Sequence, residues 1–229
     1  MGDAAKRDRE DAAAWGIPAA RVVRWPVLAA VVVAIALQLV LPSRLVGSLG
    51  NRYLIPGLEI LLLLALAVAN PGQIGEEQKR LRVLSIVLIA LITVANFASL
   101  IALIHALLYS SKTGGRVLVY ASVPIWLTNV IAFGLWFWEL DRGGPAARRQ
   151  VSHRHPDFLF PQMSTMGADP TWTPGFDDYL YTSFTNATAF SPTDTMPLTG
   201  WAKLLMALQS LASLITVAVV ISRAVNILG

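Results

Sequence analysis

Five apolar segments, separated by polar or charged connections, constrain this chain more than any other feature. They are Val22–Leu41, Tyr53–Ala69, Val83–Leu108, Val117–Leu140 and Trp201–Leu228. A helix of about 20 residues crosses the hydrocarbon core of a bilayer, and the segments approach or exceed that length. Only 14% of the 229 residues are charged, against about 25% in soluble domains. The sequence therefore predicts an all-α integral membrane protein with five transmembrane helices, located in the cell membrane.

The distribution of Lys and Arg predicts how these helices are oriented. If the segments cross alternately, 13 of the 18 basic residues fall on the side that holds the N-terminus and the long connection before the last segment. Basic loops of membrane proteins prefer the cytoplasm, so we expect a cytoplasmic N-terminus. Basic loops that face anionic lipid also account for the net charge of +4. We therefore expect the lipid bilayer, and no nucleic acid, as a partner.

The chain divides into three parts. Residues 1–21 carry both charge signs and are expected to form a cytoplasmic N-terminal segment, which an uncleaved first helix follows. Residues 22–116 form a three-helix membrane region. Residues 117–229 form a module with an outer helix, a long loop at Asp141–Phe176, a short polar helix with a turn, and an inner helix. Three loop arginines are expected to meet lipid headgroups: Arg148, Arg149 and Arg154.

The segment Asp177–Thr199, DDYLYTSFTNATAFSPTDTMPLT, is the most informative for function. It combines an amphipathic helix pattern with a polar turn, and the last apolar segment follows directly. Because unpaired backbone groups cannot face lipid, such a segment is typical of a re-entrant helix and turn that line a cavity. The alternative is a short helix in the membrane interface, with Ser191–Asp194 as the N-cap turn of the next element.

This segment resembles the pore helix and filter of two-helix potassium channels, in which an aromatic-Ser-Phe/Val helix precedes T-x-x-T-T-V-G-Y-G-D and then x-x-P-x-T. The aligned filter positions are Thr188, Ala189, Phe190, Ser191, Pro192 and Thr193, followed by Asp194 at the acidic position. The resemblance implies one pore loop per chain, and hence a homo-oligomer, most naturally a tetramer, that passes monovalent cations. Nearly the whole chain also resembles a family of five-span bacterial membrane proteins with no established activity.

The filter positions depart from the potassium-channel pattern. Ser191 and Thr193 stand where that filter requires glycine, and Pro192 between them has a fixed φ. We therefore expect a wider polar ring of hydroxyls from Thr188, Ser191 and Thr193 with the Asp194 carboxylate, and little selectivity among cations. The charge distribution also places this loop on the cytoplasmic side, whereas potassium channels present it from outside.

Polar residues within the apolar segments are further candidates, because such residues are costly in a membrane. They are Glu59, His105, Asn96, Asn129 and Gln209. A Glu59–His105 pair would make a proton-sensing or proton-relay element, or a structural hydrogen bond between helices. Asn96 and Asn129 are expected to bond across their helices. Gln209 faces either a pore cavity or another helix.

Motifs for catalysis are absent from the sequence. There is no cysteine for thiolate chemistry, there are three histidines, and no nucleotide-binding or nucleophile motif is present. We expect no enzyme, no cofactor and no metal site. The sequence favours a subunit of an oligomeric cation pore with a degenerate filter. The alternatives are a non-conducting accessory or scaffold membrane protein and a proton-coupled transporter.

Overall fold

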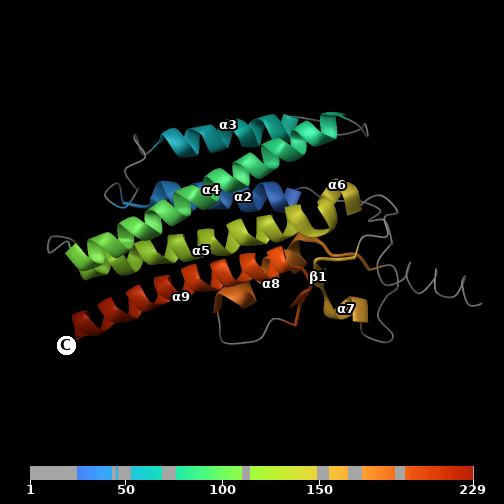
Figure 1. Ribbon diagram of the computed structural model, residues 1–229. Helices are drawn as coiled ribbons and strands as arrows, with labels where there is room; N and C mark the ends of the chain where they lie inside the picture. Colours follow the sequence, from blue (N-terminus) through green and yellow to red (C-terminus); the bar gives the residue numbers. More distant parts are fainter. Residues whose placement is uncertain are drawn as a thin grey trace, which may run out of the picture.

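The computed structural model describes residues 25–42, 45, 53–68, 76–109, 114–148, 155–164, 172–188 and 194–228, and these are mostly helical (Figure 1). Long helices run roughly along one direction in a bundle. They are α2 (Trp25–Val40), α3 (Leu54–Val68), α4 (Glu76–Tyr109), α5 (Gly115–Leu140) and α9 (Gly200–Leu228). The expected N-terminal segment 1–21 lies outside the described residues.

Three of the described helices are long and apolar enough to cross a membrane. Their candidate spans are Lys79–Tyr109, Gly115–Gly143 and Gly200–Ser222. The predicted helical structure is therefore confirmed, and the three long apolar helices are consistent with a membrane protein. The other two expected spans form apolar helices of 16 and 15 residues, α2 and α3, which fall short of the usual spanning length.

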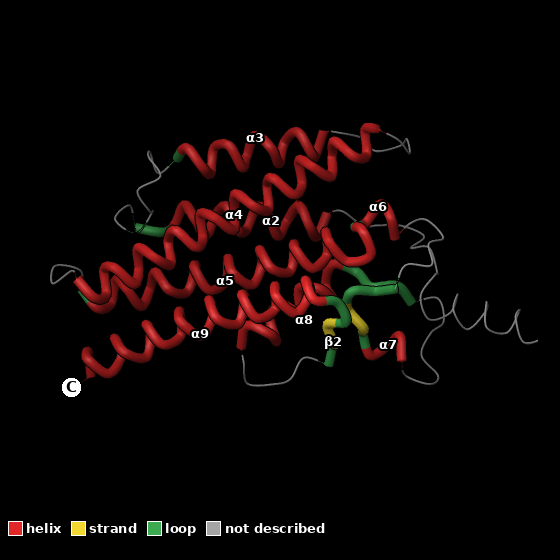
Figure 2. Tube along the Cα trace, viewed as in Figure 1, coloured by secondary structure: helices red, strands yellow, loops and turns green. Residues whose placement is uncertain are grey.

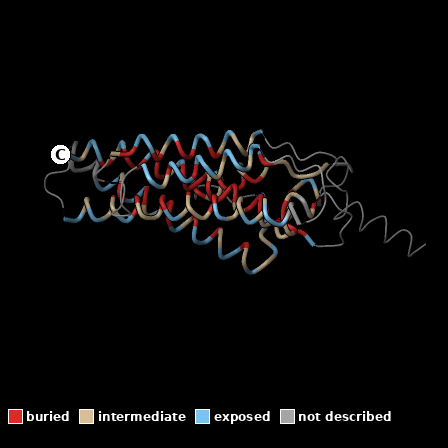
Figure 3. The backbone as a smooth tube through the Cα atoms, turned by 90° about the horizontal axis from the view of Figure 1, so that it is seen from above, coloured by how far each residue is buried: buried red, intermediate tan, exposed pale blue. Residues whose placement is uncertain are grey.

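Helix α5 lies at the centre of the bundle, where α2, α4, α8 (Phe176–Thr188) and α9 pack against it. Its inward-facing side chains include Phe133, Leu135 and Phe137, each at most 1% exposed. Buried residues follow the inner faces of the helices and exposed residues the outer faces (Figure 3). Many outward side chains are themselves apolar, including Leu61 on α3 and Leu204 on α9. Such an exterior suits lipid better than water.

The connection between α5 and α9 contains short elements that the sequence pattern did not reveal. They are η1 (Asp141–Gly143), α6 (Pro145–Arg148), β1 (Phe158–Leu159), α7 (Pro161–Ser164) and β2 (Met196–Pro197). Strands β1 and β2 pair antiparallel, with Phe158 opposite Pro197 (Figure 2). This pairing brings the segment before α9 back to the end of α5.

A buried carboxylate, Asp141, holds this end of the bundle together. Its Oδ2 accepts hydrogen bonds from the Tyr179 hydroxyl at 2.6 Å and from Arg142 Nε at 3.1 Å. Its Oδ1 accepts from the Asp157 backbone N–H at 2.8 Å. Asp141 is 0% exposed. Burial of a carboxylate is costly, and these charge-assisted hydrogen bonds offset the cost. They tie the end of α5 to the loop and to the first turn of α8.

Arg148 completes this junction, and the expectation that it meets lipid headgroups was wrong. The side chain is buried, and its Nη1 donates at 2.8 Å to the backbone oxygens of both Trp138 and Asp141. The guanidinium also lies over the rings of Trp138 and Tyr179, 5.7 and 5.2 Å from their centroids. The sharp turn after α5 brings it there. Arg149 and Arg154 lie outside the described residues.

The turn itself depends on left-handed backbone angles. Arg142 has φ 51° and Gly144 has φ 98°. A Cβ at Gly144 would lie 2.8 Å from the Glu139 backbone oxygen, which is closer than real side chains approach. Glycine is therefore required at this position.

We expect Asp141→Ala to lower the free energy of unfolding by about 3–5 kcal/mol, because it leaves a buried arginine and a buried hydroxyl without their acceptor. SDS titration in mixed micelles, followed by circular dichroism, measures the change. The exposed Asp194 provides the control, and Asp194→Ala should change stability by less than about 0.5 kcal/mol. Equal losses in the two variants would contradict the role of Asp141.

Candidate functional site: the α5–α8–α9 unit

Helix α8 occupies the place where the sequence predicts a pore helix. Its 13 residues correspond to about 20 Å of helix, against about 43 Å for the 29 residues of α9. Its first turn lies at the junction around Asp141, and the backbone oxygen of Ala187 near its end accepts a hydrogen bond from the Ser213 hydroxyl of α9. Helix α8 therefore runs beside roughly the first half of α9 and ends near the middle of that candidate span.

A glycine allows α8 to approach α5 closely. A Cβ at Gly134 would lie 3.2 Å from the Cα and Cδ1 atoms of Leu180, tighter than most real contacts. The Ser183 hydroxyl next to it donates to the Val130 backbone oxygen at 2.6 Å. The close approach and this hydrogen bond both fix α8 on the surface of α5.

Gln209 forms the centre of a polar seam between α8 and α9. Its side chain is 0% exposed. Its Nε2 donates to the backbone oxygen and the hydroxyl of Ser183, at 2.8 and 2.6 Å. Its Oε1 accepts from Asn186 Nδ2 at 2.8 Å. Of the two alternatives for Gln209, the structure supports the contact with another helix, because every polar atom of the amide has a partner inside the chain.

Neighbouring polar groups extend this seam. Asn186 also donates to the Met206 backbone oxygen at 2.9 Å, and the Ser210 hydroxyl donates to Asn186 Oδ1 at 3.1 Å. The Trp126 indole donates to the Ser213 hydroxyl at 2.6 Å. These groups therefore satisfy one another across the contact between α8 and α9, whereas Oδ1 of the neighbouring Asn129 has no hydrogen-bond partner among the described residues.

The first turn of α8 is anchored by a buried tyrosine. Burial raises the pKa of the Tyr179 hydroxyl far above its usual range, although the nearby Arg148 opposes the shift. The hydroxyl therefore stays neutral and donates to Asp141.

The first turn of α8 also contains two carboxylates, those of Asp177 and Asp178. Partial burial raises the pKa of Asp178, and the Gly175 N–H, which donates to Oδ2 at 2.7 Å, lowers it. The Asp178 bond to Gly175 fits a helix-capping role for that residue.

The structure describes only the two ends of the expected filter. Thr188 is half-buried, and its hydroxyl donates to the Thr185 backbone oxygen at 2.9 Å. Asp194 is exposed. Ala189, Phe190, Ser191, Pro192 and Thr193 lie outside the described residues. The chain after Asp194 returns along α8, since the Thr182 hydroxyl donates to the hydroxyl of the buried Thr195 at 3.1 Å.

Of the polar residues expected within the membrane region, the structure brings Asn129 and Gln209 together, whereas Glu59 and His105 have different surroundings. Glu59 accepts a hydrogen bond from Gln38 Nε2 at 3.2 Å, whereas His105 is exposed and its ring lies 4.9 Å from that of Tyr109. Asn129 donates to the Gln209 backbone oxygen at 3.3 Å. Asn96 is buried. The hydrogen bonds of Glu59 and Asn129 therefore lead to Gln38 and Gln209 instead of to the partners expected from the sequence.

Three residues that organise this unit were not foreseen from the sequence: Asp141, Arg148 and Tyr179. Each has a hydrogen bond or a ring contact to another of them. One signal was available. An acidic residue and a Gly-Gly pair directly after an apolar helix indicate a tight turn with a carboxylate at the helix end. The distances along the chain hid the rest, because Tyr179 lies 38 residues after Asp141.

We expect Gln209→Leu to lower the free energy of unfolding by about 1–3 kcal/mol, since it leaves the buried groups of Ser183 and Asn186 without their partner. The measurement is the same micellar titration. Gln162→Leu makes the same chemical change at an exposed residue of α7, and its effect should stay below about 0.5 kcal/mol. A pore-lining Gln209 would instead tolerate the substitution as well as Gln162 does.

No protein-family model, curated protein or solved structure matches the chain significantly. Among the described residues, no group of three His, Cys, Asp or Glu side chains is arranged to hold a metal ion. The arrangement of α5, α8 and α9 is therefore the feature from which a function can be inferred.

Proposed function

We propose that this chain is a five-span membrane protein in which α8 and the turn after it form a re-entrant element. The support is geometric. Helix α8 starts at the end of α5, reaches the middle of α9 and is followed by a return to the β1–β2 pair within eight residues, 189–196. A pore loop has this shape: a helix about half as long as its neighbours, and then a short stretch of chain that leads back to the side from which the helix started.

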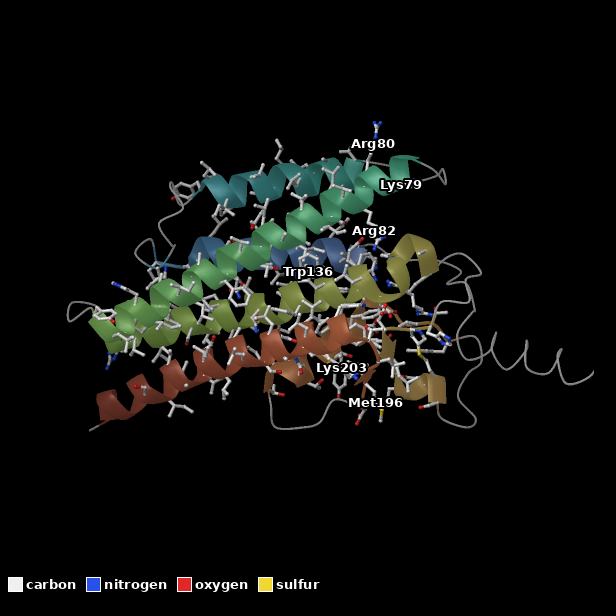
Figure 4. The ribbon with its side chains drawn as sticks, in the orientation of Figure 1. Lys79, Arg80, Arg82, Trp136, Met196 and Lys203 are labelled. Atoms are coloured by element: carbon white, nitrogen blue, oxygen red, sulfur yellow. The ribbon has the colours of Figure 1, made fainter. Side chains whose placement is uncertain are left out.

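The basic residues favour one orientation of this protein. Lys79, Arg80, Arg82 and Lys203 lie toward the bundle end that holds α6 and α7 (Figure 4). Arg142 and Arg148 lie in η1 and α6 at the same end, and Arg116 lies at the start of α5 on the opposite end. By the preference of basic residues for the cytoplasm, the re-entrant element enters from the cytoplasmic side.

We further propose that the protein is a subunit of an oligomeric cation pore, most naturally a tetramer. The observation that carries this proposal is the buried, hydrogen-bonded contact of α8 with α9 around Gln209. Because the Gln209 amide is used within the chain, we place the conduction path where turns from several chains meet, and not between α8 and α9 of one chain. The exposed Tyr181 and Phe184 on α8, 60% and 47% exposed, then provide contact area for the neighbouring subunits.

The chemistry of the turn sets the expected selectivity. Ser191, Pro192 and Thr193 do not allow the carbonyl ladder of a potassium filter, because two of its positions need glycine. Hydroxyl groups and the exposed Asp194 carboxylate attract cations without fully replacing their hydration shell. We therefore propose conduction of monovalent cations with weak discrimination.

A second function, a non-conducting accessory or scaffold protein, is favoured by the same seam. All polar atoms of the Gln209 side chain are used inside the chain, as they would be in a unit built for packing alone. The separation of the buried Glu59 from the exposed His105 lends no support to the third alternative, a transporter with these two residues as its proton relay.

The absence of cysteine allows a direct test of topology. Single substitutions Lys203→Cys and Tyr109→Cys place one thiol at each end of the bundle, at exposed positions. A membrane-impermeant maleimide added to intact cells should label Tyr109→Cys and spare Lys203→Cys. Inside-out vesicles should reverse the pattern. Labelling of both thiols from one side would contradict a membrane-spanning bundle.

Ion flux tests conduction. Purified protein in liposomes should pass K⁺ and Na⁺ at similar rates and exclude Cl⁻, and Asp194→Asn should reduce the cation flux several-fold. Asp177→Asn removes the same charge from an exposed position at the base of α8 and should have a smaller effect. The absence of flux from folded, inserted oligomer would favour the accessory or scaffold function.

A further inference from the structure

The bundle contains two buried glutamates with opposite surroundings. Glu139 at the end of α5 is 3% exposed and faces Arg82, whose Nε lies 3.8 Å from its Oε1. Glu59 in α3 is 0% exposed. Its Oε1 accepts the hydrogen bond from Gln38, and its Oε2 has no hydrogen-bond partner among the described residues. Among the described residues, Glu139 therefore has a cation for its charge, whereas Glu59 has only a neutral amide.

In the part of the chain that the structure describes, the elements packed against α3 supply no charge near Glu59. They are α2 and α4. Helix α2 contains no ionisable residue. The ionisable residues of α4 lie at its two ends: Glu76, Glu77, Lys79, Arg80, Arg82, His105 and Tyr109. Helix α4 begins near the C-terminal end of α3, whereas Glu59 lies in the first half of α3 (Figure 1). The C-terminal part of α4, which contains His105 and Tyr109, diverges from α3. Tyr53 precedes α3 and is exposed.

These surroundings favour a neutral side chain. An ionised carboxylate in an apolar interior is very costly without a cation, and such groups bind a proton instead. The outer face of α3 is apolar as well, with Leu61 64% and Leu64 58% exposed. A carboxyl group enclosed in this way is accessible to lipid-soluble molecules before it is accessible to water.

We propose that Glu59 is a proton-binding site of the membrane region, in which Oε2 carries a proton while α2 and α3 are packed together. Release of the proton requires α3 to separate from α2 far enough for water to reach the carboxylate. The site is independent of the α5–α8–α9 unit and of conduction, because neither Glu59 nor Gln38 is part of that unit.

The experiment is chemical modification of the full-length protein in native membranes with N,N′-dicyclohexylcarbodiimide. The carboxylic acid gives its proton to a carbodiimide nitrogen while its oxygen bonds to the carbodiimide carbon. The resulting O-acylisourea rearranges to a stable N-acylurea, so the residue gains the mass of one reagent molecule and nothing leaves. We expect peptide mass spectrometry to find the adduct at Glu59 and to find several-fold less at Glu139.

Two further measurements sharpen the test. The adduct at Glu59 should form more slowly as the pH rises, because the reaction consumes the proton of the acid, and a water-soluble carbodiimide should not replace the lipid-soluble one. Protein unfolded in SDS should react at both glutamates, which shows that both peptides are detectable. Native protein without an adduct at Glu59, or with equal modification by the water-soluble reagent, would overturn the proposal.

Matched substitutions give an independent readout that needs no reagent. Glu59→Gln keeps the shape of a neutral acid and should leave stability in the micellar titration nearly unchanged. Glu139→Gln removes the charge that faces Arg82 and should destabilise the protein. A larger loss for Glu59→Gln than for Glu139→Gln would mean that Glu59 is ionised, contrary to the proposal.

Discussion

The carboxylate of Asp141 is the interaction on which the rest of the structure depends most. It is fully buried and accepts hydrogen bonds from Tyr179, Arg142 and the backbone of Asp157. These partners come from α8, from the turn after α5 and from the segment before β1. Without the carboxylate, the buried guanidinium of Arg142 and the buried hydroxyl of Tyr179 would lose their hydrogen-bond acceptor. Apolar residues that repack around them cannot supply another acceptor. The position of α8 is therefore set by electrostatics at its base and by packing along its length.

Asp157 extends the same constraint to α9. Its Oδ2 accepts from the Arg142 backbone N–H at 2.8 Å, and its Oδ1 accepts from the Trp201 indole at 2.9 Å. Aromatic rings fill the space around these bonds: Phe158 lies 4.9 Å from Phe137 and 5.8 Å from Trp201 between ring centroids. One set of contacts thus joins the end of α5 to the start of α9, and Tyr179 joins the start of α8 to the same place.

The buried polar groups of the described helices are of two kinds. Some form all their hydrogen bonds with other groups of the bundle, and others have an atom without a hydrogen-bond partner there. Gln209, Ser183 and Asn186 use one another completely, so they explain why α8 stays against α9. Glu59 is different, because among the described residues one of its oxygens has no hydrogen-bond partner. In a low-dielectric interior, this unpaired oxygen is the basis of the proposed proton-binding site.

Much of the fold could be predicted from local sequence, because apolar length and periodicity depend on neighbouring residues. The helical class, the three long apolar helices and the short polar helix before the last of them follow from that pattern, whereas two of the five expected spans form shorter helices. The limits of the pattern appear at particular residues. Arg148 has the composition of a surface loop, yet the left-handed turn at Arg142 brings it into the interior. Glu59 lies near the start of α3 and His105 near the end of α4, which is why the sequence suggests that they pair. In the structure α4 diverges from α3, and His105 is exposed.

By itself, the sequence determined that this chain forms apolar helices for a membrane and that a polar, hydroxyl-rich turn precedes the last of them. Only the tertiary structure decided which polar groups meet: Asp141 with Tyr179, Gln209 with Ser183 and Asn186, and Glu59 with Gln38. The physical reason is that helix formation is governed by residues a few positions apart. The partner of a buried polar group is instead chosen by how whole helices cross, and that depends on contacts between residues 21 to 38 positions apart.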